Sequence, residues 1–454
     1  MMLRKSFQGK FPRQIRFSLL GVVVAVLFVM AVQVTVPLFM RMVRPPDGNG
    51  TLDSVDIWVA PDPSQSIVYV TDKSRDCLEL HNPVDNTFIG RLGSSGSGPG
   101  ELDRPNGVAV AYRVPTTQGT KDVVFVVERD NKRVSAFSIP DHTFIGYFGQ
   151  GDLKKPYGIA VSRAGGQLRA WITDVRSGDD RVYVYTISSG GDGITGTLDF
   201  YFDVPATLES IVIDSTNQRA LICKEGSDSK VLVYDLNGNY LQSFGSGLFV
   251  DDAEGIALYR LGNGAGYIIV SDQNASPTEF EVFDRQTFQH LGHFTGETHG
   301  TDGIALCQYV LPNLPNGSFY AVHSDRTVDV YDWADIASAM NLSIHLFNGT
   351  PTGMASPPTA IPQTPELLTN YPNPFNPATR IRYRIQQPGQ VRLEVVNVRG
   401  QRIRTLVQGF QGTGTYQVMW DGTNQQGHAV ASGVYFLQLI QQKNVARHKM
   451  LLTR

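Results

Sequence analysis

Short apolar runs recur along the middle of the chain at nearly constant spacing. They are registered on six hydrophobic residues: Ile57, Val108, Ile159, Ile211, Ile256 and Ile304. Successive register residues are 51, 51, 52, 45 and 48 positions apart, and each run is followed by a second apolar run and then by an alternating stretch such as RVYVY or KVLVY. Alternation with a period of two is typical of β-strands. A fixed period of this length with several short strands per repeat predicts a six-bladed β-propeller.

The predicted propeller covers residues 53–340, in a chain whose fold class is all-β. One blade cannot bury both of its faces alone, so the six blades must stack around an axis. Equivalent strand ends then meet at a central channel, where a ligand can contact six loops. Helical periodicity is nearly absent after residue 45, and only residues 333–337 (WADIA) predict a short helix.

The N-terminus combines a basic segment with an apolar one. Five basic residues among the first 16 precede an apolar stretch over residues 17–40, and Arg41 and Arg44 follow it. This order is typical of an export signal, and the stretch is long enough to span a bilayer. The excess of positive charge before the stretch favours a cytoplasmic N-terminus. We therefore expect residues 1–45 to be a signal peptide or membrane anchor, the only membrane-contacting part of a secreted or cell-surface protein.

The C-terminal part of the chain divides into a linker and a small domain. Residues 341–369 are rich in Ser, Thr, Pro and Gly and read as an exposed linker. Residues 370–454 contain alternating strands joined by Arg-Gly, Asp-Gly and Ser-Gly turns, which predict a small Ig-like β-sandwich.

This tail resembles the C-terminal sorting domain of proteins exported by the type IX secretion system. The matching segments are Tyr371–Phe375, Gly400-Gln401, Trp420–Gly422, Gly427, Ser432–Phe436 and Lys449-Met450. The resemblance implies translocation across the outer membrane, with the type IX machinery as a partner. A related Ig-like module occurs in flagellar hook assembly scaffolds, and a purely structural tail is the alternative.

Composition narrows the possible partners and the chemistry of the cysteines. A formal net charge of −3 with 18% charged residues does not favour nucleic acid as a partner. Cys77, Cys223 and Cys307 lie in three different repeats, and their spacing is neither a metal signature nor a disulfide framework. We expect three small buried hydrophobic residues, with one long-range disulfide as the alternative.

Polar residues interrupt the apolar runs at a shared position, two residues before the register residue. These six positions hold Val55, Asn106, Tyr157, Glu209, Glu254 and Asp302. The ends of the second runs add Lys73, Arg129, Arg176, Lys224, Glu225, Gln273 and His323. Carboxylates gathered on one rim repel each other unless a cation neutralises them, and hard oxygen ligands suit Ca²⁺. Lys and Arg beside them suit a phosphate. The alternative is that each acidic residue only closes a turn.

Residues 53 to about 338 resemble the β-propeller phytases, which are secreted calcium-dependent phosphatases that hydrolyse myo-inositol hexakisphosphate. The strongest matches are Asp252–Ile256, Gly266–Ile268, Ser271–Gln273, Phe283–Arg285, Thr301–Ile304 and Asp332–Ala337. Weaker matches are Asp53 with Ile57–Val59, Thr71–Lys73 and Tyr157-Gly158.

The resemblance implies a set of site residues and several calcium ions as cofactor. The implied metal ligands are Asp53, Glu209, Glu225, Asp252, Glu254, Gln273 and Asp302. Among these, Glu209, Glu254 and Asp302 have the implied catalytic role, activating water for attack on phosphorus. The implied ligands of a phytate-like phosphorylated small molecule are Lys73, Arg129 and Tyr157. Lys224, at the end of a second run, is a further candidate for this role.

The sequence also departs from the phytase pattern and leaves two alternatives open. A paired aspartate at the first strand is Asp53-Ser54 here, a Glu-Glu pair in the fourth repeat is Lys224-Glu225, and the acidic loop before Thr301 is shortened. Residues 96–108 (GSGPGELDRPNGV) resemble the NHL repeat, whose propellers bind proteins or glycans without a metal. The third class is a lactonase-like propeller hydrolase with one calcium ion deep in the channel.

Overall fold

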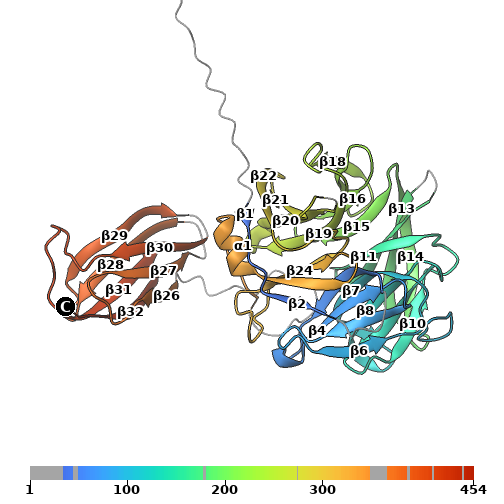
Figure 1. Cartoon of the computed structure of the whole chain (residues 1–454), viewed down its shortest axis with the longest axis horizontal. Helices are drawn as coiled ribbons and strands as arrows, with labels where there is room; N and C mark the ends of the chain where they lie inside the picture. The colour runs from blue at the N-terminus through green and yellow to red at the C-terminus, as the bar shows by residue number, and fades with distance from the viewer. Residues whose placement is uncertain are drawn as a thin grey trace, which may run out of the picture. The chain divides into compact units, whose positions relative to one another are not determined.

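The computed structural model describes residues 34–43, 50–176, 180–273, 275–347, 366–385, 389–411, 414–441 and 444–453. The described residues before 340 form six sheets of four or five strands, which follow one another around a ring from blue to orange in Figure 1. The predicted all-β class is confirmed.

The six sheets are numbered here in chain order, and in each the first strand is the innermost. Sheet 1 contains β3 (Leu52–Trp58), β4 (Ile67–Asp72), β5 (Cys77–His81) and β6 (Phe88–Leu92). Sheet 2 contains β7 (Pro105–Thr116), β8 (Gly119–Glu128), β9 (Arg133–Ile139) and β10 (Phe144–Phe148). Sheet 3 contains β11 (Pro156–Ala164), β12 (Gln167–Asp174), β13 (Asp180–Gly190) and β14 (Gly193–Val204).

The second half of the ring repeats this pattern with added N-terminal strands. Sheet 4 contains β15 (Leu208–Asp214), β16 (Arg219–Lys224), β17 (Lys230–Asp235) and β18 (Tyr240–Phe244). Sheet 5 contains β19 (Ala253–Arg260), β20 (Gly266–Asp272), β21 (Glu279–Asp284), β22 (His290–Thr295) and β1 (Val34–Thr35). Sheet 6 contains β23 (Ile304–Cys307), β24 (Ser318–His323), β25 (Thr327–Asp332) and β2 (Met40–Met42).

The innermost strands close a ring. Each first strand contacts the first strand of the next sheet, and β23 contacts β3. Every sheet therefore packs between two neighbours, which explains why the second strands are continuous apolar runs. In β8, Val124 and Val126 pack with Tyr69 of sheet 1, whereas Phe125 and its alternate neighbours pack with Ile172 of sheet 3. Both faces of the strand are buried, so its pattern does not alternate.

The N-terminal strands lie within the segment that the sequence predicted to be a signal or anchor. Met40, Arg41 and Met42 pair antiparallel with β25 and supply the fourth strand of sheet 6. Arg41 makes a two-pronged ion pair with the buried carboxylate of Asp329, at 2.5 Å and 2.9 Å. The ring thus begins before the predicted boundary at residue 53, and a predicted anchor that extends to residue 45 is wrong in its last part. Residues 1–33, which hold the rest of that prediction, lie outside the described residues.

The chain after sheet 6 stays on the ring for longer than predicted. The predicted short helix is confirmed as α1 (Trp333–Ala339). Beyond it, Ser343 N–H donates to the Tyr267 hydroxyl and Phe347 N–H donates to the Gln308 carbonyl, both at 2.8 Å. Residues 341–347 therefore belong to the ring and not to the predicted linker, most of which lies outside the described residues.

The tail forms two sheets around its own core. One contains β26 (Glu366–Tyr371), β27 (Thr379–Ile385) and β30 (Gly414–Trp420). The other contains β28 (Gly389–Asn397), β29 (Arg402–Gln411), β31 (Gly433–Gln441) and β32 (Asn444–Leu452). Trp420, Ile381, Leu393 and Leu437 are buried between them, as expected for a β-sandwich.

Two further expectations are settled by burial and by helix length. Cys77, Cys223 and Cys307 are all buried and unpaired, as the small-hydrophobe interpretation predicts. Among the described residues, no helix is both long and apolar enough to cross a membrane. The short 3₁₀ segments η1 (Pro63–Gln65) and η2 (Gly262–Gly264) complete the elements.

Candidate active site at the rim of the ring

A β-bulge near the start of the first strand recurs in sheets 1 to 5 and aligns them. After the bulge, Val55 faces Val70, Val108 faces Val126 and Ile159 faces Ile172. Val55 is therefore the register residue of sheet 1, and the predicted register on Ile57 is wrong by two positions. The rim residue of this sheet is Asp53 in place of Val55. The six equivalent rim residues are Asp53, Asn106, Tyr157, Glu209, Glu254 and Asp302, and all of them are polar.

In four of the six sheets the residue after the rim residue is a glycine, which lets neighbouring first strands approach closely. A Cβ on Gly303 would lie 2.4 Å from the Asp53 carbonyl oxygen, and one on Gly255 would lie 2.8 Å from the Asp302 carbonyl oxygen. Gly107 and Gly158 make the same approach to Tyr157 and Glu209. No Cβ tolerates these distances, so the glycines set the spacing between rim residues.

Buried hydroxyl groups on the second strands fix the bulges. Thr71 Oγ1 accepts a hydrogen bond from Ser54 N–H at 2.9 Å and donates to the Asn106 carbonyl at 2.8 Å. Thr173 repeats this arrangement with Gly158 N–H and the Glu209 carbonyl. Each hydroxyl ties a bulge to the rim residue of the following sheet, and bulges are known to re-aim side chains next to sites.

One group of rim side chains is centred on Lys73. Its ammonium nitrogen lies 2.5 Å from Asp53 Oδ1 and 3.9 Å from Asp302 Oδ2, and Gln273 Nε2 donates to Asp302 Oδ1. Burial lowers the pKa of Lys73, but the carboxylates of Asp53, Asp302 and Glu209 raise it overall. Burial, followed by Asp53, raises the pKa of Asp302 to about 7.

A second group consists of three carboxylates. Glu209, Glu225 and Glu254 offer oxygens that all lie within 4.8 Å of one another. Burial, followed by Glu254 and Glu225, raises the pKa of Glu209, and burial, followed by Glu225 and Asp302, raises the pKa of Glu254. Three carboxylates this close cannot all be ionised without a cation, so the group is either protonated or metal-bound.

A third group lies on sheets 2 and 3. The Arg129 guanidinium carbon is 5.0 Å from the centre of the Tyr157 ring, a cation–π contact, and among the described residues the guanidinium N–H groups have no hydrogen-bond partner. Burial, followed by Glu209, raises the pKa of Tyr157. Asn106 is 1% exposed, and neither polar atom of its amide has a hydrogen-bond partner in the described part of the chain. An amide in this state points to a further group at the rim.

Two sequence-predicted site residues have other partners. Lys224 Nζ donates to the carbonyls of Glu225, Ser227 and Asp228, so it closes its own loop. Asp252 Oδ1 accepts from Gly226 N–H at 2.6 Å. Glu225 and Gln273 occupy the same position in their sheets as Lys73 does in sheet 1. In all three, the backbone N–H donates to the carbonyl of the residue that precedes the first strand of the same sheet.

One acidic residue near the rim was missed by the sequence interpretation. Asp325, in the turn between β24 and β25, has its pKa raised by burial and then by Asp302, and lowered by Lys73. It lies outside both repeated positions, so periodicity offered no signal for it. Arg176 and His323 bind elsewhere, to Asp174 and Asp329 respectively.

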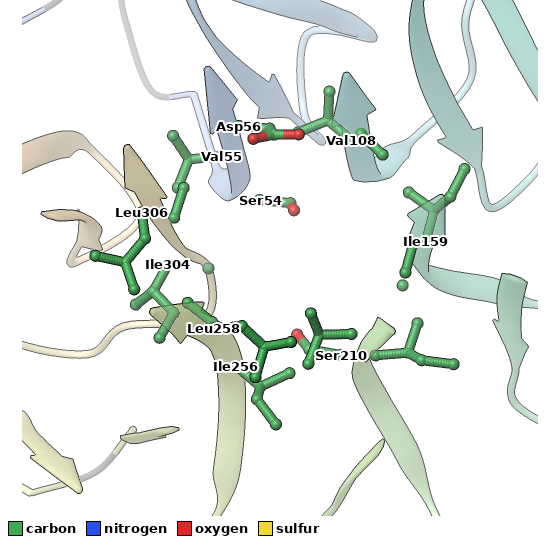
Figure 2. Close-up of a pocket in the computed structure, with 18 of the residues that line it drawn as sticks. Ser54, Val55, Asp56, Val108, Ile159, Ser210, Ile256, Leu258, Ile304 and Leu306 are labelled. Carbon is green, nitrogen blue, oxygen red and sulfur yellow. The ribbon is translucent and has the colours of Figure 1, made fainter. Parts of the chain in front are cut away.

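Below the rim the ring encloses a cavity of about 240 Å³. Figure 2 shows Val55, Val108, Ile159, Ile256 and Ile304 around its open centre. Asp56 is the one carboxylate in this lining among the described residues, and it accepts from Val110 and Ile57 N–H groups. Ser54, Ser210 and Arg260 also line the cavity, but most of its lining is aliphatic, whereas the carboxylate groups gather at the rim.

Comparison with known proteins gives the chain a distant relative and its tail a family. A 3-phytase of Bacillus subtilis (strain 168) is 24% identical over 303 residues, which cover 60% of this chain and 75% of that protein. Residues 378–444 match the FlgD Ig-like domain family. The fold and the rim are therefore those of an all-β, propeller-like protein with distant similarity to a phytase, followed by an Ig-like domain.

Two solved structures are similar at low scores. PorZ, described as an essential bacterial surface component of the type-IX secretion system of Porphyromonas gingivalis, has a TM-score of 0.39 at 14% identity, over 90% of this chain and 53% of PorZ. The Cps50 (Swd1) β-propeller domain of Myceliophteria thermophila has a TM-score of 0.40 at 8% identity, over 63% of this chain and 98% of that domain.

Proposed function

We propose that this protein is an exported, calcium-dependent phosphomonoester hydrolase built on a six-bladed β-propeller. Its substrate is phytate or a related phosphate ester. The observation that carries the proposal is the convergence of the Glu209, Glu225 and Glu254 carboxylates within 4.8 Å of one another. The distant similarity to a 3-phytase supports the same reaction class.

The donor set at the rim fits calcium. Carboxylate and amide oxygens are the ligands that Ca²⁺ prefers, and it takes six to eight of them. Glu209, Glu225 and Glu254 would hold one ion, and Asp53, Asp302 and Gln273 supply further oxygens beside them. The raised pKa values of Glu209 and Glu254 have burial and mutual repulsion as their causes, and a divalent cation relieves the repulsion.

Basic side chains flank the acidic group and suit the substrate's phosphates. Lys73 and Arg129 would bind phosphate oxygens, and the Tyr157 ring holds the Arg129 guanidinium in place. When bound, calcium supplies charge neutralisation and activation of a water molecule. Asp302, whose pKa burial raises to about 7, would have to lose its proton before it binds calcium.

The tail and the N-terminal segment support export in this proposal. The Ig-like tail would act as a type IX sorting domain that brings the enzyme to the cell surface or releases it. The competing function is a metal-free propeller that binds a protein or glycan, and a lactonase-like hydrolase is disfavoured because the channel below the rim is lined mainly by aliphatic side chains.

The test is calcium-dependent release of inorganic phosphate from phytate by the purified full-length protein. We expect release that EDTA abolishes and that Glu254→Gln lowers at least 100-fold. Asp235→Asn is the matched control, because Asp235 is a carboxylate in the exposed β17–β18 turn. Folded protein that releases no phosphate with calcium present would favour the binding function and overturn the proposal.

A further inference from the structure

A second group of metal-ligating side chains lies on the outer strands of sheet 5. Glu279 and Glu281 are two residues apart on β21, so their side chains project from the same face of the sheet. His293 on β22 is the cross-strand partner of Glu281. Ligand atoms of Glu279, Glu281 and His293 all lie within 4.8 Å of one another. These residues belong to a different part of sheet 5 from the rim residue Glu254.

The contacts place His293 between the two carboxylates. Its Nδ1 is 3.4 Å from Glu281 Oε1, and its Nε2 is 3.8 Å from Glu279 Oε1. Nε2 is buried, and it has no hydrogen-bond partner among the described residues. One ion binds a single nitrogen of an imidazole, so Nε2 is the candidate ligand and the Nδ1 contact supports the ring. The 3.8 Å between Nε2 and Glu279 Oε1 is too long for a good hydrogen bond but is close to the separation of two atoms that each lie about 2.0–2.2 Å from one tetrahedral ion.

His290 orients the innermost carboxylate. A bulge follows Val282 in the pairing of β21 with β22, and it brings His290 Nε2 into contact with Glu281 Oε2. Glu281 is 2% exposed. A histidine that holds the far oxygen of a ligating carboxylate is a recurrent supporting contact of metal sites, because it fixes the carboxylate's orientation.

The surrounding charge favours a cation. Asp272 is the cross-strand partner of Glu279, and its carboxylate accepts hydrogen bonds from Val250 N–H and Asp251 N–H. In the described part of the chain, no lysine or arginine forms an ion pair with Asp272, Glu279 or Glu281. The negative charge of this part of sheet 5 is therefore available to a bound cation.

We propose that Glu279, Glu281 and His293 bind one divalent transition-metal ion. Zinc fits best, because it is commonly bound by imidazole nitrogen together with carboxylate oxygen. His290 is a positioning residue for Glu281. Calcium is disfavoured at this site because imidazole nitrogen is a poor ligand for that ion. The site is separate from the proposed hydrolase site and does not depend on it.

The test measures bound metal in the full-length protein with excess calcium present to saturate the rim. After dialysis against Zn²⁺, we expect one zinc per chain by elemental analysis, and with Co²⁺ a visible d–d absorption band. His293→Ala should remove both signals, and Glu279→Gln should weaken binding at least tenfold. His428→Ala, an exposed histidine of the tail, is the matched control, and Glu254→Gln should leave the zinc content unchanged.

Two outcomes would overturn the proposal. One is the same zinc content in His293→Ala as in the unchanged protein, provided both melt cooperatively. The other is the absence of zinc and of a cobalt band in the unchanged protein, which would assign the group to an imidazolium–carboxylate network. If His293→Ala fails to fold, Glu279→Gln replaces it as the test. Zinc binding weakened at least tenfold in this variant supports the metal site, and unchanged binding overturns it.

Discussion

The ammonium nitrogen of Lys73 lies 2.5 Å from Asp53 Oδ1. This contact joins the end of the second strand of sheet 1 to the rim residue of its first strand. The same ammonium is 3.9 Å from Asp302 Oδ2, on the opposite side of the closure between sheets 6 and 1. Lys73 is therefore a cation that the ring itself provides for its acidic rim.

Removing this cation should impair hydrolysis more than folding. Lys73→Met retains the aliphatic stem but deletes the charge that would bind a phosphate oxygen. We expect kcat/KM for phytate to fall at least tenfold, which corresponds to about 1.4 kcal/mol of lost transition-state binding. Lys121→Met, which alters a surface pair with Asp141 at 3.7 Å, is the control. Equal kcat/KM values in the two variants would contradict the role of Lys73.

Glu254→Gln should stabilise the calcium-free protein. Burial and neighbouring carboxylates raise the pKa of Glu254 above its unfolded value. The raised pKa lowers the free energy of unfolding. This loss of stability is absent below about pH 4.5, the unfolded pKa, and grows as the pH rises above it. At pH 7.5 the glutamine should therefore raise the Tm without calcium by about 2–4 °C for each kcal/mol relieved. Scanning calorimetry in EDTA measures this, and a lower Tm would contradict it. Asp235→Asn should give no increase, because hydrogen bonding to Asn239 lowers the pKa of Asp235.

Calcium affinity should depend on pH. Asp302, with a pKa of about 7, and Glu254 must lose protons before they can ligate the ion. We expect the calcium Kd to rise at least tenfold between pH 8 and pH 6. Calorimetric titration in two buffers of different ionisation enthalpy should detect protons released on binding. A Kd independent of pH would mean that the ion binds elsewhere.

Truncation of the N-terminus should destabilise the ring. A chain that starts at residue 46 lacks β2 and leaves the Asp329 carboxylate without Arg41, whereas a chain that starts at residue 33 keeps both. We expect the shorter chain to melt at a lower temperature. Arg41→Met alone should cost about 1–3 kcal/mol, because a buried charge loses its partner. Arg181→Met, which alters the exposed pair with Asp203, should leave the Tm unchanged. An equal fall in Tm in the two variants would contradict a stabilising role of the Arg41–Asp329 pair.

Gly303→Ala should damage both stability and the site. Its Cβ would meet the Asp53 carbonyl oxygen at 2.4 Å, so sheets 6 and 1 would have to move apart. We expect the free energy of unfolding to fall by about 1–3 kcal/mol or more and the calcium affinity to decrease. Scanning and titration calorimetry on the same preparation measure the two effects. Gly262→Ala is the control, because nothing lies within 4 Å of a Cβ there. Calcium binding that survives in Gly303→Ala would show that the rim tolerates wider spacing.

The sequence period predicted most strands of the ring but not the N-terminal strand that completes sheet 6. The second strands were recognisable because both of their faces are buried, which produces continuous apolar runs. The strand over Met40–Met42 was not, because an apolar run reads alike as a membrane segment and as a buried strand. Arg41, counted with the flanking charges of an anchor, is in fact paired with Asp329.

The candidate site was recoverable where the rim position is regular. Glu209, Glu254 and Asp302 followed from the position two residues before the register residue. Asp53 did not, because the apolar phrase SVDIWVA was aligned on Ile57, whereas the strand pairing makes Val55 the counterpart of Val108. Asp325 lies in a turn, and the group around Glu281 depends on cross-strand pairing. Neither is visible in a one-dimensional pattern.

The glycines at Gly107, Gly158, Gly255 and Gly303 have a consequence for how such a protein can diversify. Because main chain lies against main chain at these four points, the spacing of the strands there is set by the backbone and not by the rim side chains. Acidic residues there can be exchanged for neutral or aromatic ones without rebuilding the scaffold. A change of ligand specificity at the opening is therefore compatible with unchanged strand spacing at these four points.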